Sequence, residues 1–333
     1  MASPSTTYSA TVETARGPIP VESLGRTLMH EHIFTMNAEY NLERPGKWDE
    51  EREVENAIAK LTKLKELGFD SMLDCTVLGL GRNVPRVARI CNEVELNVVV
   101  ATGAYATEEM PRLFALKGPG TLLGGPEPMT KMFLEDLTEG VGDSGVRAAF
   151  LKLAVENKSP VSERICRAIT DAHTETGAPI TVHTNGPRET GRIAVTYLEE
   201  FGADLTKVVI GHAGESDDID YLRWIADKGA YIGFDRIGAE FNHTTENYVR
   251  KIALLATEGR ADRVVLGHDA ACSMQHFTDD FGKRKLAELA PDWNYTFIPK
   301  VVVPMLREQG VTEDQLETML VTNPVRYFLG GTQ

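Results

Sequence analysis

Short apolar runs alternate with longer stretches of helical period along most of the chain. The runs are rich in Val, Ile and Leu and are continuous, which is typical of parallel strands covered on both faces. Eight of them are predicted to be strands: 27–33, 71–75, 97–102, 147–153, 180–183, 207–212, 230–234 and 263–268. Eight strands that alternate with helices predict an α/β protein with a (β/α)8 barrel fold.

The stretches between the strands have the periodicity of amphipathic helices. The clearest are 53–67, 161–176 and 217–228. A glycine directly follows each of them, and glycine most readily takes the left-handed conformation that ends a helix. Three more helices are predicted near the C-terminus, at 299–309, 312–320 and 323–328. Because α/β barrels reach this length as one unit, residues 1–333 are predicted to form a single domain.

Three segments do not fit the alternation of strands and helices and are predicted to be additions to the barrel. A polar, β-prone stretch with a Gly-Pro turn predicts a β-hairpin within residues 1–25. Two connections, 104–127 after the third strand and 270–298 after the eighth, are longer than a barrel needs. The second is rich in aromatic residues, which favours an ordered binding loop. The connection after the seventh strand is short by comparison.

Composition excludes several classes of partner. The apolar fraction of 42% is ample for a large core. A formal net charge of −14 argues against nucleic-acid and anionic-membrane partners, both of which select basic surfaces. No signal peptide or membrane span is evident, and the four cysteines form no CxxC pair. We therefore expect a cytoplasmic protein with reduced thiols.

Metal-binding residue types lie at the C-terminal ends of five of the predicted strands. They are His30 and His32 in HEH, Lys152 in FLK, His183 in TVH, His212 in IGH and Asp269 in GHD. Lys152, His183 and His212 follow one another at intervals of about 30 residues, the length of a strand and its return helix. The C-terminal strand ends of a barrel meet on one face, so the spacing predicts a metal centre there.

The first of these motifs has a defined orientation. His30 and His32 are two residues apart on a strand, so both side chains point to the same face and Glu31 points away from them. Asp269 is expected to be a ligand and proton carrier, with helix capping as the alternative role. The neighbouring His268 should face the other way.

The remaining histidines and the lysine leave more than one interpretation. His173, His243 and His276 are expected at the surface or beside the site without touching metal. A bare ammonium would be repelled by divalent cations. Lys152 is therefore either an outward-facing lysine paired with a helix carboxylate or an N-carboxylated lysine that bridges two metals. The residues alone do not decide between these two.

Other motifs add little, apart from two residues at strand ends. Gly79 and Gly81 lack the third glycine of a dinucleotide fingerprint, and no GxSxG elbow is present. Tyr105 and Arg236 both follow strand ends, which would bring them to the face that carries the metal ligands.

With these positions established, the chain resembles the phosphotriesterase family of the amidohydrolase superfamily, and within it the phosphotriesterase-like lactonases. The resemblance covers essentially the whole chain and includes HEH, the lysine of FLK, VIGHAGESDDIDYL and NPVRYF. It implies two divalent metal ions, with zinc expected and iron, cobalt or manganese as alternatives that the same donors accept.

The resemblance also implies how the ligands are shared. His30, His32 and Asp269 would hold the more buried metal, and His183 and His212 the more exposed one. N6-carboxylysine at Lys152 and a hydroxide would bridge the two metals.

The resemblance further implies a substrate class. Tyr105 and Arg236 match the substrate-side residues of the lactonases, and Cys272 and Trp293 would line a channel for an acyl tail. A long loop after strand eight and a short one after strand seven favour a lactonase, with N-acyl-homoserine lactones (quorum quenching) as substrates and organophosphates as a side activity. The alternatives are a primary organophosphate hydrolase, another ester or amide hydrolase, and a non-catalytic binding module. The family also suggests a homodimer.

Overall fold

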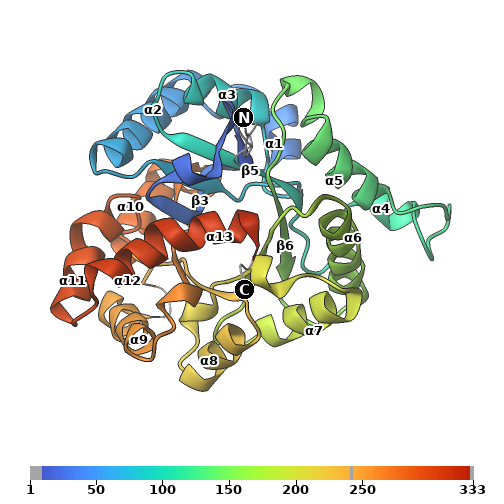
Figure 1. Ribbon diagram of the computed structural model, residues 1–333. Helices are drawn as coiled ribbons and strands as arrows, with labels where there is room; N and C mark the ends of the chain where they lie inside the picture. The colour runs from blue at the N-terminus through green and yellow to red at the C-terminus, as the bar shows by residue number, and fades with distance from the viewer. Residues whose placement is uncertain (1–9, 241–242, 331–333) are drawn as a thin grey trace, which may run out of the picture.

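The computed structural model describes residues 10–240 and 243–330 and confirms the barrel (Figure 1). Eight parallel strands follow one another in chain order around the sheet. They are β3 (Thr27–Thr35), β4 (Ser71–Asp74), β5 (Asn97–Ala104), β6 (Phe150–Val155), β7 (Ile180–Thr184), β8 (Val208–Gly211), β9 (Tyr231–Phe234) and β10 (Val264–Leu266). The Asp269 N–H donates to the His30 carbonyl at 3.0 Å, so the chain after β10 returns to β3 and closes the sheet.

One strand of this sheet was not predicted. β11 (Ala271–Met274) pairs in parallel with the end of β3, with Ala271 opposite His32. Its sequence, ACSM, is short and carries small residues, so it has no strand signal of its own, and it forms because β3 continues to Thr35. The predicted fourth strand began at 147, whereas β6 begins at Phe150.

Helices cover the outside of the sheet, and the predicted segments are confirmed. The longer ones are α2 (Glu50–Glu66), α3 (Val84–Cys91), α5 (Pro128–Thr138), α6 (Pro160–Thr176), α7 (Gly191–Phe201), α8 (Ile219–Asp227) and α9 (Thr245–Thr257). The C-terminal ones are α11 (Val303–Glu308), α12 (Glu313–Glu317) and α13 (Asn323–Leu329), with π-helical turns at Ile298–Val302 and Thr318–Thr322. In α6, Ser159 and Ser162 form a capping box, and Gly177 at φ 72° ends the helix.

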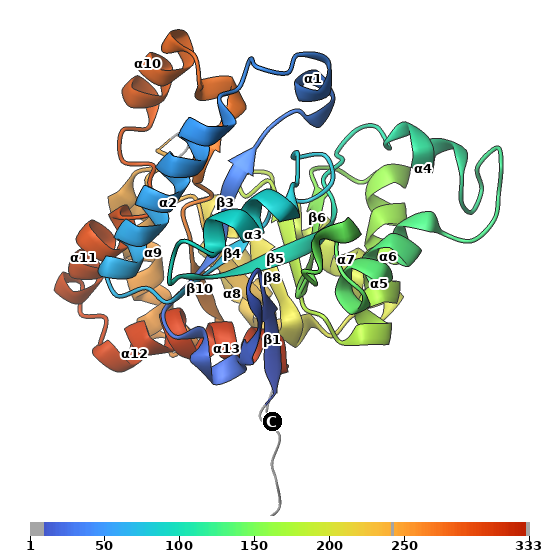
Figure 2. The same cartoon turned by 90° about the horizontal axis from the view of Figure 1, so that it is seen from above.

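The two ends of the barrel are built differently (Figure 2). The predicted hairpin, β1 (Thr11–Thr14) and β2 (Gly17–Pro20), lies at one end with α13. At the other end, after the strands, lie α1 (Ala38–Glu43), α4 (Arg112–Leu116) and α10 (Asp280–Leu289). The two long connections are therefore partly helical, and both reach the face where the strands end.

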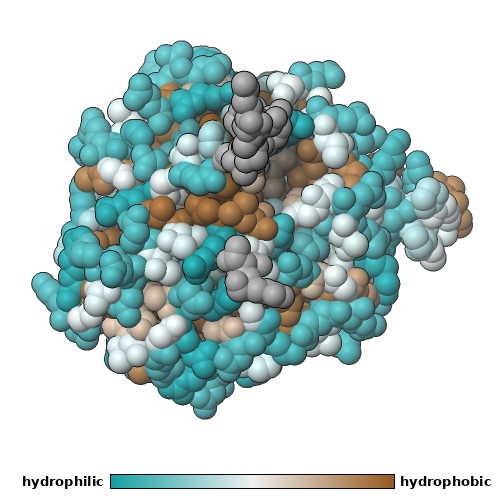
Figure 3. Space-filling model, in the orientation of Figure 1, coloured by the Kyte–Doolittle hydropathy of each residue, from teal (hydrophilic) through white to brown (hydrophobic). Residues whose placement is uncertain are grey.

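The face of the molecule seen in Figure 3 is mostly hydrophilic, with an apolar group at the tip of the segment after α4. Leu122 and Leu123, at this tip, are 85% and 70% exposed. Among the described helices, none is both long and apolar enough to cross a bilayer. Cysteine pairing is absent, since all four cysteines are buried free thiols.

The barrel interior changes character along its axis. Phe150, Tyr231 and Tyr327 fill its lower part together with aliphatic side chains, and the Tyr327 hydroxyl lies 2.8 Å from that of Thr181. Lys152 follows Phe150 by two residues and therefore points to the same interior, one layer higher. The apolar floor closes one end of the barrel and leaves the polar strand ends as the open face.

Close approach of β5 and β6 depends on Gly103. A Cβ at this position would lie 1.8 Å from the Lys152 carbonyl oxygen, and the residue has φ 144°. We predict that Gly103→Ala lowers the free energy of unfolding by about 3 kcal/mol or more, measured by urea denaturation. Gly259→Ala is the control, because Gly259 has φ 77° and open space around it; its loss should be about 1 kcal/mol. Equal losses in both variants would contradict the close-contact explanation.

Candidate metal centre

Strand alternation brings the first two histidines into the barrel. His30 and His32 point inward from β3, and both are buried. Glu31 points outward, where it accepts hydrogen bonds from the backbone N–H of His268 and from its imidazole Nδ1 at 2.7–2.8 Å. His268 thus faces away from the centre, as expected, and its Nε2 accepts from the Ile298 N–H.

Lys152 lies inside the barrel, so the outward-facing interpretation is wrong. Its side chain is 1% exposed, and its Nζ lies 3.1 Å from His30 Nε2. Burial lowers the pKa of this amine, and the positive charge of Arg236 acts in the same direction. The neutral amine is therefore favoured relative to a lysine in water.

The other predicted ligands meet at the same place. Asp269 Oδ1 lies 3.1 Å from His32 Nε2 and 3.4 Å from His30 Nε2. His212 Nε2 lies 2.9 Å from His183 Nδ1 and 3.7 Å from Asp269 Oδ2. Donor atoms of His30, His32 and Asp269 are close enough to share one ion. The structure thus gathers every residue that the sequence nominated as a ligand.

The outward nitrogen of each imidazole is held by a hydrogen-bond acceptor that sequence reasoning missed. Asp235 Oδ2 lies 2.6 Å from His30 Nδ1, and its Oδ1 lies 3.0 Å from His212 Nδ1. Glu156 Oε1 lies 2.7 Å from His183 Nε2.

The acceptor beside His32 is a hydroxyl. Thr76 Oγ1 lies 2.8 Å from His32 Nδ1 and donates its own proton to Asp74 at 2.6 Å. Thr76 therefore accepts from the imidazole. Asp74, Glu156 and Asp235 all end or follow a strand, so the strand-end rule that nominated the ligands could also have nominated them.

These contacts fix where the imidazole protons lie. Contacts with His212 and His30 hold the pKa of Asp235 well below its usual range, against the effect of burial, so this carboxylate only accepts. The Nδ1 atoms of His30 and His212 and the Nε2 atom of His183 then carry the protons. Burial lowers the pKa of His183 to about 4, and that of His212 well below its usual value, so both rings are neutral near pH 7.

It follows that unprotonated nitrogens face one another. His183 Nδ1 and His212 Nε2 both present lone pairs at a separation of 2.9 Å. Two acceptors so close repel unless a cation or a proton lies between them, and neutral imidazole nitrogens with carboxylates are the donors that zinc and related ions prefer. The residues present therefore fit divalent metal ions.

The backbone is strained at two of these positions. Among the described non-glycine residues, only Glu189, His212 and Asp269 have positive φ, and the last two lie in the centre at 61° and 54°. Residues other than glycine persist in this conformation only when their surroundings hold them there. For His212 that support includes a hydrogen bond from its N–H to Asp235 at 2.7 Å.

Tyr105 and Arg236 also reach this face. The Tyr105 hydroxyl lies 3.2 Å from His183 Nε2, and burial raises its pKa to about 12, so it remains protonated. Arg236 Nε donates to Asp269 Oδ2 at 3.0 Å, and its Nη1 donates to buried Glu215 at 3.2 Å. Arg236 is thus engaged by two carboxylates and orients Asp269.

The predicted tail-channel residues lie beside the centre. Trp293 Nε1 donates to the His268 carbonyl at 2.6 Å, and its ring lines two cavities of about 420 and 410 Å3 between α2 and the segment after Asp269. Cys272 also lines the first of these, but it is 2% exposed and its Sγ lies 3.3 Å from the Tyr295 hydroxyl.

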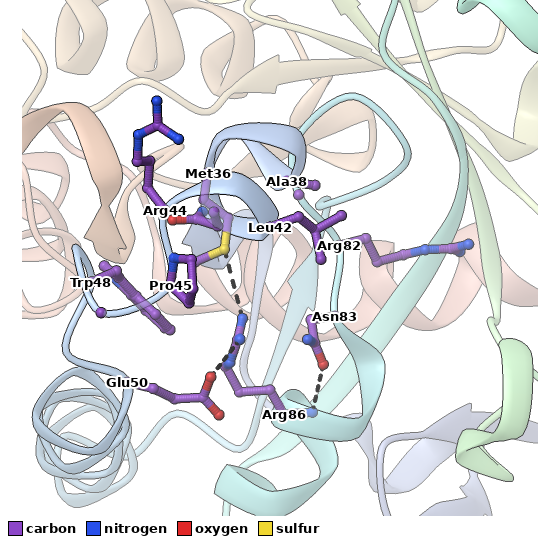
Figure 4. Close-up of a pocket in the computed structure, with 13 residues that line it drawn as sticks. Met36, Ala38, Leu42, Arg44, Pro45, Trp48, Glu50, Arg82, Asn83 and Arg86 are labelled. Atoms are coloured by element: carbon purple, nitrogen blue, oxygen red, sulfur yellow. Dashed lines mark hydrogen bonds and ion pairs between the residues drawn. The ribbon is translucent and has the colours of Figure 1, made fainter.

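Another cavity, of about 450 Å3, lies between the end of β3 and the start of α3 (Figure 4). The guanidinium of Arg86 lies over the Trp48 ring at 4.6 Å and donates to Glu50 at 2.7 Å. The side chains of Arg44 and Arg82 point away from this cavity in Figure 4. None of the metal-centre residues lines it.

The remaining histidines lie outside the ligand cluster. His173 is buried, not at the surface: its Nδ1 lies 2.7 Å from the Ala178 carbonyl, and its Nε2 accepts from the Asp204 N–H. His243 contacts the carbonyl of Glu215. The ring of His276 lies 4.4 Å from that of Phe277, at an angle of 58°, in the segment after β11.

Known proteins are similar to this chain over nearly its whole length. The phosphotriesterase family matches residues 10–328. A phosphotriesterase homology protein of Mycobacterium tuberculosis is 43% identical over 97% of this chain and 99% of its own length. A solved structure of the phosphotriesterase from Mycobacterium tuberculosis has a TM-score of 0.92 at 43% identity, covering 96% of this chain and 98% of that one.

More distant relatives carry other names. An aryldialkylphosphatase of Saccharolobus solfataricus is 30% identical over 93% of this chain and 96% of its own length. An N-acetyltaurine hydrolase of Danio rerio is 23% identical over 95% and 97%. By its sequence, its barrel and the donors that converge at the strand ends, the chain belongs to the phosphotriesterase family of metal-dependent hydrolases.

Proposed function

We propose that the protein is a lactonase with two metal ions, which opens lactones such as N-acyl-homoserine lactones and hydrolyses organophosphate triesters as a side activity. The observation that carries the metal requirement is the 2.9 Å approach of two unprotonated nitrogens, His183 Nδ1 and His212 Nε2. The resemblance also favours a homodimer. The net charge of −14 and the cysteine pattern favour a cytoplasmic protein with no nucleic-acid or membrane partner.

In this proposal the ligands divide into two sets. His30, His32 and Asp269 hold one ion, and His183 and His212 hold the other. Lys152, as N6-carboxylysine, would supply carboxylate oxygens to both ions. The modification joins the lysine nitrogen to carbon dioxide and releases a proton, and the lowered pKa of buried Lys152 supports it because only the neutral amine reacts. Zinc is the expected metal, and iron, cobalt or manganese suit the same donors.

Two such ions, when bound, would supply a water molecule of lowered pKa and would polarise the substrate oxygen. Asp269 accepts the proton of the attacking water and delivers it to the leaving alkoxide, which opens the lactone to a hydroxy acid. Tyr105, protonated because its pKa is raised, donates a hydrogen bond to the substrate oxygen. Arg236 holds the second oxygen of Asp269, so the carboxylate keeps one orientation through the reaction.

The substrate class is supported by the loops. The segment after Asp269 is long and ordered, with β11 and α10. Trp293, Ala271 and Tyr295 line the more apolar of its two cavities, which would take an acyl tail. The segment after β9 is shorter, because α9 already begins at Thr245. The alternative is a primary aryldialkylphosphatase, as the Saccharolobus relative is named, or another ester or amide hydrolase. A binding module without catalysis has no need of so complete a donor set.

The purified protein should hydrolyse acyl-homoserine lactones with a higher kcat/KM than paraoxon-like triesters. Initial rates on a panel of acyl and simple lactones, triesters and N-acyl amino sulfonates measure this, with metal content determined in parallel. Asp269→Asn is the inactive control for every substrate. A higher kcat/KM on triesters than on lactones would make organophosphate hydrolysis the primary activity. Turnover of amides alone would rule out both lactone and organophosphate hydrolysis.

Lys152→Ala should lose metal, since the variant has no group to lie between the two ions. Metal per chain after dialysis should fall from two toward zero, and added acetate or propionate should restore part of it by occupying the vacated space. Lys251→Ala removes another buried lysine, one that donates to the Gly214 and Ser216 carbonyls, and serves as the control. Two metals retained in Lys152→Ala would contradict the bridge.

A further inference from the structure

We propose that Asp235 is a positioning residue that couples the two metal positions, because its single carboxylate orients one histidine of each. The inference rests on the proposed two-metal function. Asp235 itself is not a ligand in this proposal: it contacts the outward Nδ1 atoms of His30 and His212, whereas the Nε2 atoms face the converging donors.

The two carboxylate oxygens divide this task. Oδ2 accepts from His30 Nδ1 at 2.6 Å, and Oδ1 accepts from both the Nδ1 and the backbone N–H of His212, at 3.0 and 2.7 Å. Asp235 therefore sets the tautomer of both rings and also supports the positive φ of His212. A displacement of this carboxylate would disturb both histidines together.

The barrel leaves a fitted space for this carboxylate. A Cβ on Gly233 would lie 2.7 Å from Asp235 Oδ2, and a Cβ on Gly211 would lie 3.1 Å from the same atom. Neither glycine has a φ in the left-handed region. Glycine is therefore needed at these two positions because a side chain would collide with the carboxylate of Asp235. Asp235 is 1% exposed, so its carboxylate is shielded from bulk solvent.

The partners of the other two histidines act on one ring each. Glu156 contacts only His183 within the centre, and its other hydrogen bond comes from Asn185. Of the four histidines of the centre, Thr76 contacts His32 alone in the described structure. In the proposed division of ligands, Glu156 supports one metal and Thr76 the other. Asp235 differs because His30 belongs to one set and His212 to the other.

Asp235→Asn tests the coupling with almost no change in shape. An amide offers one oxygen acceptor and one nitrogen donor, whereas the two histidines require an acceptor on each side. One ring is forced into the wrong tautomer, with its proton on the nitrogen that should bind metal. The other loses the charge that strengthens its hydrogen bond. Both metals should therefore bind more weakly.

The measurement is a Zn2+ titration of the full-length protein after chelation, with two dissociation constants fitted. In Asp235→Asn both constants should rise about tenfold or more, the usual size of an effect from such supporting residues. In Glu156→Gln only one dissociation constant should rise, and that constant then belongs to the ion held by His183 and His212. Asp136→Asn is the control for a buried carboxylate elsewhere, since Asp136 pairs with Thr102 and Arg82; both its constants should stay unchanged.

A measurement on the unaltered sequence keeps the inference testable if Asp235→Asn does not fold. Nitrogen NMR of the 15N-histidine-labelled, metal-free protein should show the proton of His30 and that of His212 on Nδ1. A proton on Nε2 of either ring would overturn the inference, and so would a rise in only one zinc constant in Asp235→Asn. Fewer than two zinc ions in the unaltered protein would overturn the proposed function as well.

Discussion

The open end of this barrel is built around imidazole nitrogens whose lone pairs converge and therefore require a positive charge between them. Each of four histidines is held by an acceptor behind it, so each presents a lone pair to the same small volume. Such an arrangement is unfavourable by itself, because the lone pairs repel and the rings are buried. The closed sheet holds the four rings in this arrangement, and divalent cations bound between them would remove the repulsion.

The apolar floor of the barrel makes this constraint effective. Phe150, Tyr231 and Tyr327 exclude water from below, so the groups above them lie in a medium of low polarity. Burial there lowers the pKa of Lys152 and of His183 and so favours their neutral forms. The same alternation along β6 that buries Phe150 in the floor places Lys152 beside the ligands. Packing and chemistry thus follow from one strand register.

Arg236 gives the centre a fixed positive charge. It cannot lose its proton near neutral pH, so it orients Asp269 and screens Glu215 without itself entering a proton transfer. The sequence placed Arg236 on the correct face, and the structure adds its hydrogen bonds to the carboxylates of Asp269 and Glu215.

The sequence alone determined the eight strands, their parallel order and the six residues that meet at their ends. These follow from local rules, since alternation sets which face a side chain takes and the βα period sets which end it occupies. Only the tertiary structure decided the supporting contacts, such as Asp235 behind His30, which are 205 residues apart. It also decided that ACSM forms β11, because an extended β3 offers free hydrogen-bonding groups there. Local sequence patterns determine which way a side chain points and at which strand end it lies. A hydrogen bond between distant strands depends instead on the curvature and closure of the whole sheet.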